Sequence, residues 1–126
     1  MSTLQCTNLQ DTSGGNSRTT AQIYSGTAKA WVNFDGTTAS PSTIRASFNV
    51  SSITKNGTGD YTVNFSSAFS DANYSVSAQV TDTPTYNFVS NVNGSSVTTT
   101  SVKVISFRVS DRSLADTSIY CVSVFR

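Results

Sequence analysis

Few side chains in this sequence could carry out acid–base or metal chemistry. The 126 residues include no histidine and no glutamate, so seven aspartates are the only side-chain carboxylates. Histidine and glutamate are common general acids and bases, and histidine is the commonest metal ligand. A Ser-His-Asp triad is therefore impossible, and no spacing marks two aspartates, such as Asp35 and Asp82, as the carboxylate pair of a glycosidase. We predict no enzymatic activity, no metal site and no cofactor.

Two cysteines, Cys6 and Cys121, lie near opposite ends of the sequence. A disulfide between them would close a long loop and stabilise the fold, but no spacing motif supports it. Residues 2–16 are polar throughout and show no secretory signal. The sequence favours two buried, reduced thiols and leaves their pairing open.

Composition and charge exclude several classes of function. Charged residues make up 12% of the chain and the net charge is +1, which argues against a nucleic-acid surface or a polybasic membrane patch. No apolar run reaches the roughly 18 residues that a membrane span needs. Serine and threonine form about a third of the chain and leucine is scarce, whereas valine and threonine are abundant. Such a composition predicts a single all-β globular domain.

Alternating apolar residues predict strands over residues 28–34, 44–53, 61–65, 74–80, 97–109 and 119–125. Asn56-Gly57 and Gly59 provide positions for a turn with positive φ, which would join 44–53 and 61–65 in a hairpin. A phase change predicts a β-bulge near Val104. With a weak strand around Leu4 and Cys6, this makes about seven strands in a compact antiparallel sandwich or barrel-like knob. Loops are expected over residues 11–20 and 81–96.

Two positions do not fit a strand with one buried and one solvated face. Trp31, the only tryptophan, falls on the polar face of residues 28–34 with Lys29 and Asn33. Residues 119–125 are apolar on both faces, with Ile119, Cys121 and Phe125 on one and Tyr120, Val122 and Val124 on the other. Something must cover both features.

Three sequence blocks, in their order, resemble the C-terminal tip (knob) domain of tailed-bacteriophage tail fibres. The blocks are AKAWVNFDGT, IRASFNVSSITKNGTGDYTVNF and SDANYSV, and the match covers roughly residues 24–80. The ending of the last strand, with Val122, Val124 and Phe125, also fits this family. The matched residues are core and turn positions, so they carry the fold and do not mark a ligand site.

The resemblance implies a β-sandwich tip domain over residues 28–126, connected by residues 1–27 to an upstream fibre shaft or other virion proteins. Such tips are generally homotrimers that bind lipopolysaccharide, another surface glycan or an outer-membrane protein during adsorption, without catalysis. Neither nucleic-acid binding nor membrane insertion is expected. The implied location is the virion tail fibre, after assembly in the cytoplasm of the host bacterium.

A trimer would account for both unusual features of the pattern. The expected trimer interface consists of Trp31, Tyr120, Val122 and Val124, because tryptophan is enriched in buried interface centres. Trp31 could instead lie under the N-terminal segment of its own chain, or it could be a platform on which sugars stack.

The expected receptor-binding residues lie mainly within residues 81–96. They are Tyr86 and Phe88 for packing, Asn87, Asn91 and Asn93 for hydrogen bonds, and Arg112 in a later loop for phosphate or carboxylate groups. The alternative is that Phe88 and Val92 close the end of the core while the asparagines form turns.

Two rival functions stay open. One is a structural virion protein, a fibre subunit or a head decoration, that uses the same fold for assembly and has no receptor site. The other is a bacterial surface adhesin, against which the lack of a signal peptide argues. Binding to host cells would separate the first rival from a receptor-binding tip.

Overall fold

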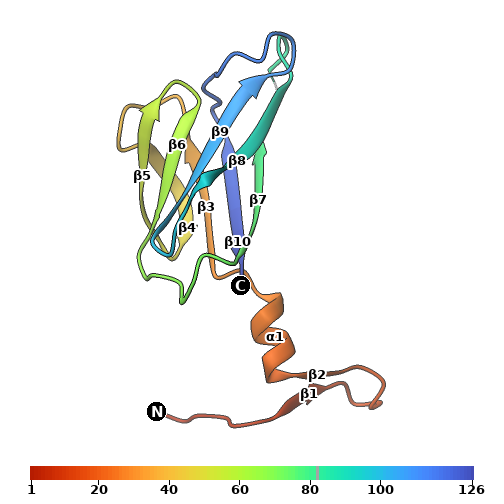
Figure 1. Ribbon diagram of the computed structural model, residues 1–126. Helices are drawn as coiled ribbons and strands as arrows, with labels where there is room; N and C mark the ends of the chain where they lie inside the picture. Colours follow the sequence, from red (N-terminus) through yellow and green to blue (C-terminus); the bar gives the residue numbers. More distant parts are fainter. Residues whose placement is uncertain (82) are drawn as a thin grey trace.

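A computed structural model describes residues 1–81 and 83–126 and shows a β-sandwich standing on an extended N-terminal arm (Figure 1). Asp82 lies outside the described residues. The elements in chain order are β1 (Asn8–Gln10), β2 (Ser17–Thr19), α1 (Thr20–Gly26), β3 (Ala30–Asp35), β4 (Thr43–Phe48), β5 (Val50–Gly57), β6 (Asp60–Phe65), β7 (Ser75–Val80), β8 (Phe88–Val97), β9 (Ser101–Arg108) and β10 (Tyr120–Phe125).

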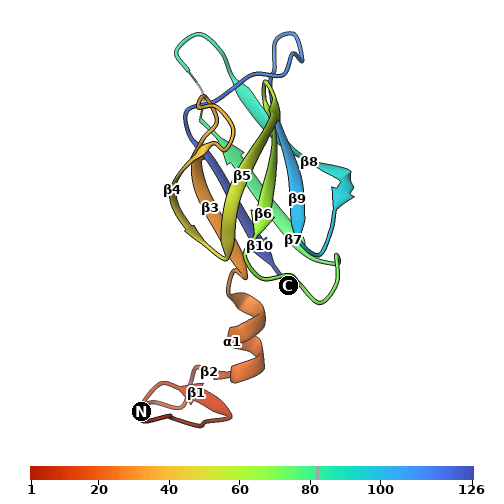
Figure 2. The same cartoon turned by 90° about the vertical axis from the view of Figure 1, so that its left-hand side faces the viewer.

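Two four-stranded antiparallel sheets form the sandwich. One has the order β4-β3-β10-β7 and is called here the β3 sheet; the other has the order β5-β6-β9-β8 and is called the β6 sheet. Figure 2 shows the two layers facing each other, and over the described residues they do not close into a barrel. The prediction of an all-β sandwich is therefore confirmed.

Residues 1–26, called the arm, lie outside the sandwich. The short hairpin of β1 and β2 leads into α1, which begins with a capping box between Thr19 and Gln22. No residue of α1 is buried, and residues 1–22 are all exposed. Sequence reasoning predicted a strand near Leu4 and a loop over residues 11–20, so it missed this helix. An isolated helix of seven residues is marginal in water, and the arm has no core of its own.

The core consists of the inward-facing residues of both sheets. At its centre the rings of Phe34 and Tyr120 stack at 5.0 Å, and Tyr61 meets each of them edge-on. Tyr120, Val122 and Val124 are only 0 to 2% exposed because they point between the sheets. The prediction that these three residues form a trimer interface is therefore wrong. The outward-facing side chains of β10 are instead Cys121, Ser123 and Phe125.

The predicted strand over residues 44–53 is in fact two strands in different sheets. Asn49 separates β4 from β5 and has a positive φ of 53°. Its side chain accepts a hydrogen bond from the amide of Ser67 at 2.8 Å and donates to the carbonyl of Lys29 at 3.1 Å. The chain crosses between sheets here because asparagine tolerates the left-handed conformation and can bond to backbone on both sides.

Three other local predictions are also wrong. β9 is regular, with Val102, Val104 and Ser106 buried, and the register shift lies opposite it in β8, between Val92 and Val97. Residues 88–97 form a strand where a loop was expected. Of the two glycines in the hairpin turn, only Gly59 has a positive φ, at 64°. Serine at the buried position of residue 106 hid the true alternation of β9.

Candidate functional site

The outer face of the β3 sheet exposes aromatic rings. Trp31 is 40% exposed, and the register places it directly opposite Phe48, which is 55% exposed. Ser123 lies opposite Trp31 on its other side. The arm extends away from this face (Figure 1), so the hypothesis that the N-terminal segment covers Trp31 is wrong. A neighbouring subunit and a ligand are the two hypotheses for Trp31 that stay open.

A cleft of about 550 Å³ lies where α1 joins the sandwich, at the end that we call the arm end. Its volume is within the range of roughly 300–1,000 Å³ that small-molecule sites occupy. We call it the arm-end cleft; it is lined by Tyr24, Lys29, Phe48, Asn49, Ser67, Ala68, Phe69, Ser70 and Arg126. Aromatic, cationic and hydrogen-bonding side chains therefore meet in one concave place.

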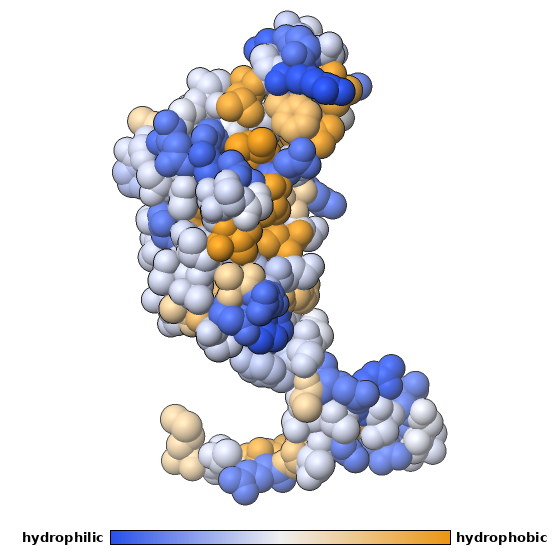
Figure 3. Space-filling model, in the orientation of Figure 1, coloured by the Kyte–Doolittle hydropathy of each residue, from blue (hydrophilic) through white to orange (hydrophobic). Residues whose placement is uncertain are grey.

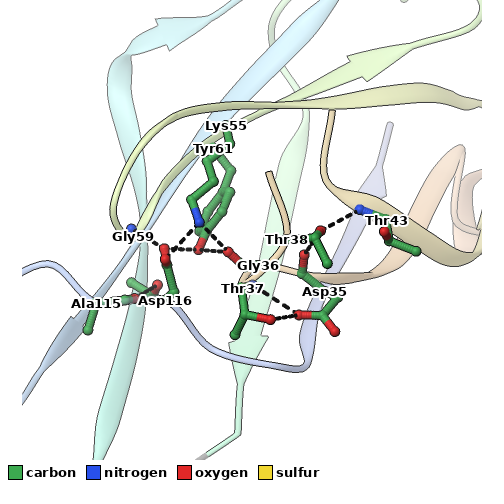
Figure 4. Close-up of polar contacts among 11 residues, drawn as sticks. Asp35, Gly36, Thr37, Thr38, Thr43, Lys55, Gly59, Tyr61, Ala115 and Asp116 are labelled. Atoms are coloured by element: carbon green, nitrogen blue, oxygen red, sulfur yellow. Dashed lines mark hydrogen bonds and ion pairs between the residues drawn. The ribbon is translucent and has the colours of Figure 1, made fainter. Parts of the chain in front are cut away.

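The far end of the sandwich, opposite the arm, is closed by a polar network (Figure 4). The ammonium of Lys55 donates to Oδ2 of Asp116 at 2.7 Å and to the carbonyl of Gly36 at 2.9 Å. The amide of Gly59 donates to Oδ1 of Asp116 at 2.8 Å, and the hydroxyl of Tyr61 lies 2.7 Å from the same oxygen. Burial alone would raise the pKa of Asp116, but the Lys55, Gly59 and Tyr61 hydrogen bonds outweigh it and lower that pKa.

Two glycines permit this closure. A Cβ on Gly59 would lie 2.4 Å from the carbonyl oxygen of Ser106, and a Cβ on Gly36 would lie 2.5 Å from the hydroxyl of Tyr61. Burial, and then the hydrogen bond to Asp116, raises the pKa of Tyr61. The phenol therefore stays protonated and donates. Every group of this network is satisfied by its own chain, so we assign it to folding.

The residues predicted to contact a receptor do not form one surface. Tyr86, Asn87 and Arg112 lie in loops at the far end, whereas Phe88, Asn91 and Asn93 lie along β8. Val89 pairs with Phe107 on the outer face of the sheet. Successive residues of a strand point to opposite faces, so Phe88, Ser90 and Val92 face inward.

The far-end loop that holds Tyr86 closes on itself. The backbone amide of Tyr86 donates to Oγ1 of Thr83 at 3.1 Å, and the Tyr86 ring lies 4.6 Å from the guanidinium of Arg108. A depression of about 290 Å³ beside it is lined by Pro84, Thr85, Tyr86, Asn87, Val109 and Ser110. The ring of Tyr86 anchors its own loop and leaves 42% of the residue exposed.

The outer face of the β6 sheet is different in chemistry. Figure 3 shows apolar side chains gathered over β8 and β9. Val89 lies opposite Phe107, which also bridges to Leu114, and Ile105 follows on the same face of β9. Asn91 lies opposite Ile105, and the ion pair of Lys103 with Asp60 lies on the same face, so polar groups border this apolar patch.

The described residues contain no group of three or more His, Cys, Asp or Glu side chains that could hold a metal ion. Within the same ranges, no helix is long and apolar enough to cross a membrane. Cys6 and Cys121 are free; Cys6 is exposed, so the expectation of a buried thiol is wrong there, and Cys121 is half-buried.

Comparison of the chain with protein-family models, with curated proteins and with solved structures finds no match.

Sequence reasoning missed the arm-end cleft. Lys29 precedes β3 and Arg126 follows β10, and these two strands are antiparallel neighbours. Strand pairing therefore brings together two cations that are 97 positions apart in the chain. The available signal in the sequence was a basic residue beside each of two strands, the first and the last of the sandwich. This signal points to a shared site only when the pairing of these two strands is known.

Proposed function

We propose that this protein is the non-catalytic tip of a bacteriophage tail fibre, acting as a homotrimer that binds a glycan or an outer-membrane protein on the host surface. In this proposal the protein resides in the virion after assembly in the host cytoplasm, and the arm leads to a fibre shaft. The observation that carries it is the arm, which stands outside the sandwich without one buried residue of α1.

The arm argues for assembly because it cannot be stable alone. A hairpin of two three-residue strands and a helix of seven residues are each too short to persist alone in water. Leu4 and Leu9 expose 85 and 53% of their surface, respectively. Parallel arms of three chains would bury these side chains against each other, as a fibre shaft does.

Trp31 supports the same assembly from the sandwich side. A half-exposed tryptophan beside a half-exposed phenylalanine is typical of the centre of a protein interface. In the proposed trimer the neighbouring subunit covers Trp31, while Phe48 at the edge of the same face also lines the arm-end cleft. The cleft then lies beside the interface and stays open to solvent.

Host adsorption tests the binding part of the proposal. The whole chain is labelled with a fluorophore and mixed with a panel of Gram-negative strains that differ in surface polysaccharide, and bound protein is measured by flow cytometry. We expect saturable binding to some strains and none to derivatives of the same strains that lack the receptor. Competition by purified polysaccharide identifies a glycan, and loss after protease treatment of the cells identifies a protein.

Absence of binding across the panel would overturn the receptor-binding assignment. In that case, tight association with other virion proteins would establish the rival function, a structural virion protein.

A further inference from the structure

We propose that the arm-end cleft binds a pyranose sugar carrying one carboxylate, as in a uronic acid. This inference rests on the proposed function, because a host polysaccharide would present the sugar. The proposed site lies at the arm end, whereas sequence reasoning predicted a site around Tyr86 at the far end. The two cations of the cleft are the first part of the site.

Lys29 places a fixed positive charge in the cleft wall. Its three N–H groups donate to the carbonyl and the hydroxyl of Thr27 at 2.8 and 3.0 Å and to the carbonyl of Tyr24, and the ammonium lies 3.9 Å from the centre of the Tyr24 ring. These partners are neutral. In the described part of the chain no carboxylate forms an ion pair with Lys29, so its charge is uncompensated.

Arg126 is held by a carboxylate that leaves part of its guanidinium available. Nε and Nη2 donate to Asp71 at 2.9 and 2.5 Å, and the amide of Asn73 fixes Asp71 in turn at 2.8 Å. The hydrogen bonds from Arg126 come first among the causes that lower the pKa of Asp71. Asp71 therefore stays ionised and orients the arginine, while Nη1 has no partner among the described residues.

Of the two cations of the cleft, only Lys29 has no carboxylate partner among the described residues, whereas Arg126 pairs with Asp71. A ligand with one carboxylate would give Lys29 a partner of opposite charge and accept charge-assisted hydrogen bonds from Nη1 of Arg126. A polyanion such as nucleic acid would need a longer basic surface, and the net charge of the chain is only +1.

The other walls suit the body of a sugar ring. Tyr24 and Phe48 expose ring faces that can pack against the C–H groups of a pyranose. Ser67 and Ser70 supply hydroxyl groups that can pair with sugar hydroxyls. A flat aromatic ligand would leave these polar groups unused, so the combination favours a carbohydrate.

The cleft is formed before any ligand arrives. Asn49 connects its walls, because its side chain bonds to the backbone of both Ser67 and Lys29. The amide of Phe69 donates to the carbonyl of Thr99 at 2.8 Å, and its ring packs edge-on against Phe65 at 4.7 Å. Little ordering is therefore lost on binding, which favours affinity for a small ligand.

The test is a titration of the ¹⁵N-labelled whole chain with glucuronate, followed by backbone amide shifts, with glucose as the uncharged control. We expect saturable shifts at Lys29, Ser67, Ser70 and Arg126, and about tenfold weaker binding of glucose. Arg126→Gln should weaken glucuronate binding about tenfold, and Arg126→Lys should retain part of the affinity. Tyr24→Ala should weaken both sugars equally, because it removes a ring face and no charge.

Arg112→Gln is the matched control, since Arg112 is an exposed arginine in the loop that follows β9, and that loop lies at the far end (Figure 1). It should leave glucuronate binding unchanged. Equal binding of glucuronate and glucose, shifts at the far end only, or no shifts at all would each overturn the proposal. Adsorption to cells without glucuronate binding would refute this site and keep the proposed function. Glucuronate binding without adsorption to any strain would support this site and refute the proposed function.

Discussion

The two ends of the sandwich carry the same pair of groups, a basic side chain and an aspartate, in opposite settings. At the far end Lys55 and Asp116 have side chains that are 16 and 26% exposed, and backbone and phenol groups complete their hydrogen bonds. At the arm end Arg126 and Asp71 are 42 and 36% exposed and border an open cleft. The difference is enclosure, because one pair is saturated by its own chain and the other keeps donor capacity for a ligand.

This comparison separates folding from binding. Removing one partner of an enclosed pair leaves a charge with little water around it, which costs stability. Removing one partner of an exposed pair costs little, because water replaces the lost contact. The same kind of substitution should therefore lower the stability of the fold when it is made at the far end, and lower the affinity for a ligand when it is made at the arm end.

Gly59→Ala should have the largest effect on the free energy of unfolding. The left-handed conformation costs alanine roughly 1–2 kcal/mol, and forcing its methyl group into Ser106 and Ala115 adds roughly 1–3 kcal/mol. We expect a total loss of about 2–5 kcal/mol, measured by urea denaturation. The matched control is Gly57→Ala, because a Cβ added at this position would have no neighbouring atom within 4 Å. Similar losses for the two variants would contradict the closed far end.

Asp116→Asn should come next, with a loss of about 2 kcal/mol in the same measurement. Asparagine can still accept from Gly59, but Lys55 loses the carboxylate that neutralises it in a mostly enclosed position. Asp111→Asn, in the exposed pair with Arg108 at 3.7 Å, serves as control and should cost much less stability. A cost for Asp116→Asn no larger than the control would show that enclosure does not matter here.

The pH dependence of stability sharpens the same point. The pKa of Asp116 is lowered in the folded protein, so it binds protons less readily there than in the unfolded chain. Its contribution is complete above the unfolded value of about 4 and is lost as the pH falls through the lower folded pKa. Thermal unfolding followed by circular dichroism should show the unsubstituted protein losing stability below about pH 4. Asp116→Asn should lose less stability over that interval. If both proteins lose the same stability below about pH 4, other carboxylates cause the loss.

Arg126→Gln should have the smallest effect on folding, because its pair with Asp71 is solvent-exposed and water replaces the lost contact. Its effect on glucuronate affinity should nevertheless be large. The urea midpoints and the sugar titrations of this variant are therefore measured on the same preparation. A loss of stability comparable to that of Asp116→Asn would make Arg126 a structural residue and remove it from the proposed site.

Sequence reasoning could predict the class of the fold, because alternating apolar residues report which side chains are buried. The alternation identified the inward set of β3, and together with the turn residues Asn56-Gly57 and Gly59 it predicted the hairpin of β5 and β6. It failed at two places where the pattern of apolar residues does not report the path of the backbone or the burial of a side chain. Asn49 redirects the chain between sheets, and Ser106 is buried with its hydroxyl bonded to the carbonyl of Ala115 at 2.6 Å.

The candidate site was less predictable than the fold, for a physical reason. The arm-end cleft joins Lys29, Phe48, Ser67 and Arg126, which come from four separate segments of the chain. Only the pairing of β3 with β10 and the crossover at Asn49 bring them together. The loop that sequence reasoning favoured, around Tyr86, stood out by composition alone, and composition also marks residues that merely anchor their own loop.

The mass of the protein in solution, by size-exclusion chromatography with light scattering, tests the central claim that the arm and Trp31 are covered by copies of the chain. We expect a species of three times the 13.4 kDa mass of one chain, and for Trp31→Ser a fall towards the mass of one chain without loss of β-sheet signal. A clean monomer of 13.4 kDa for the unsubstituted protein would contradict it. Trp31 would then be a surface offered to a ligand.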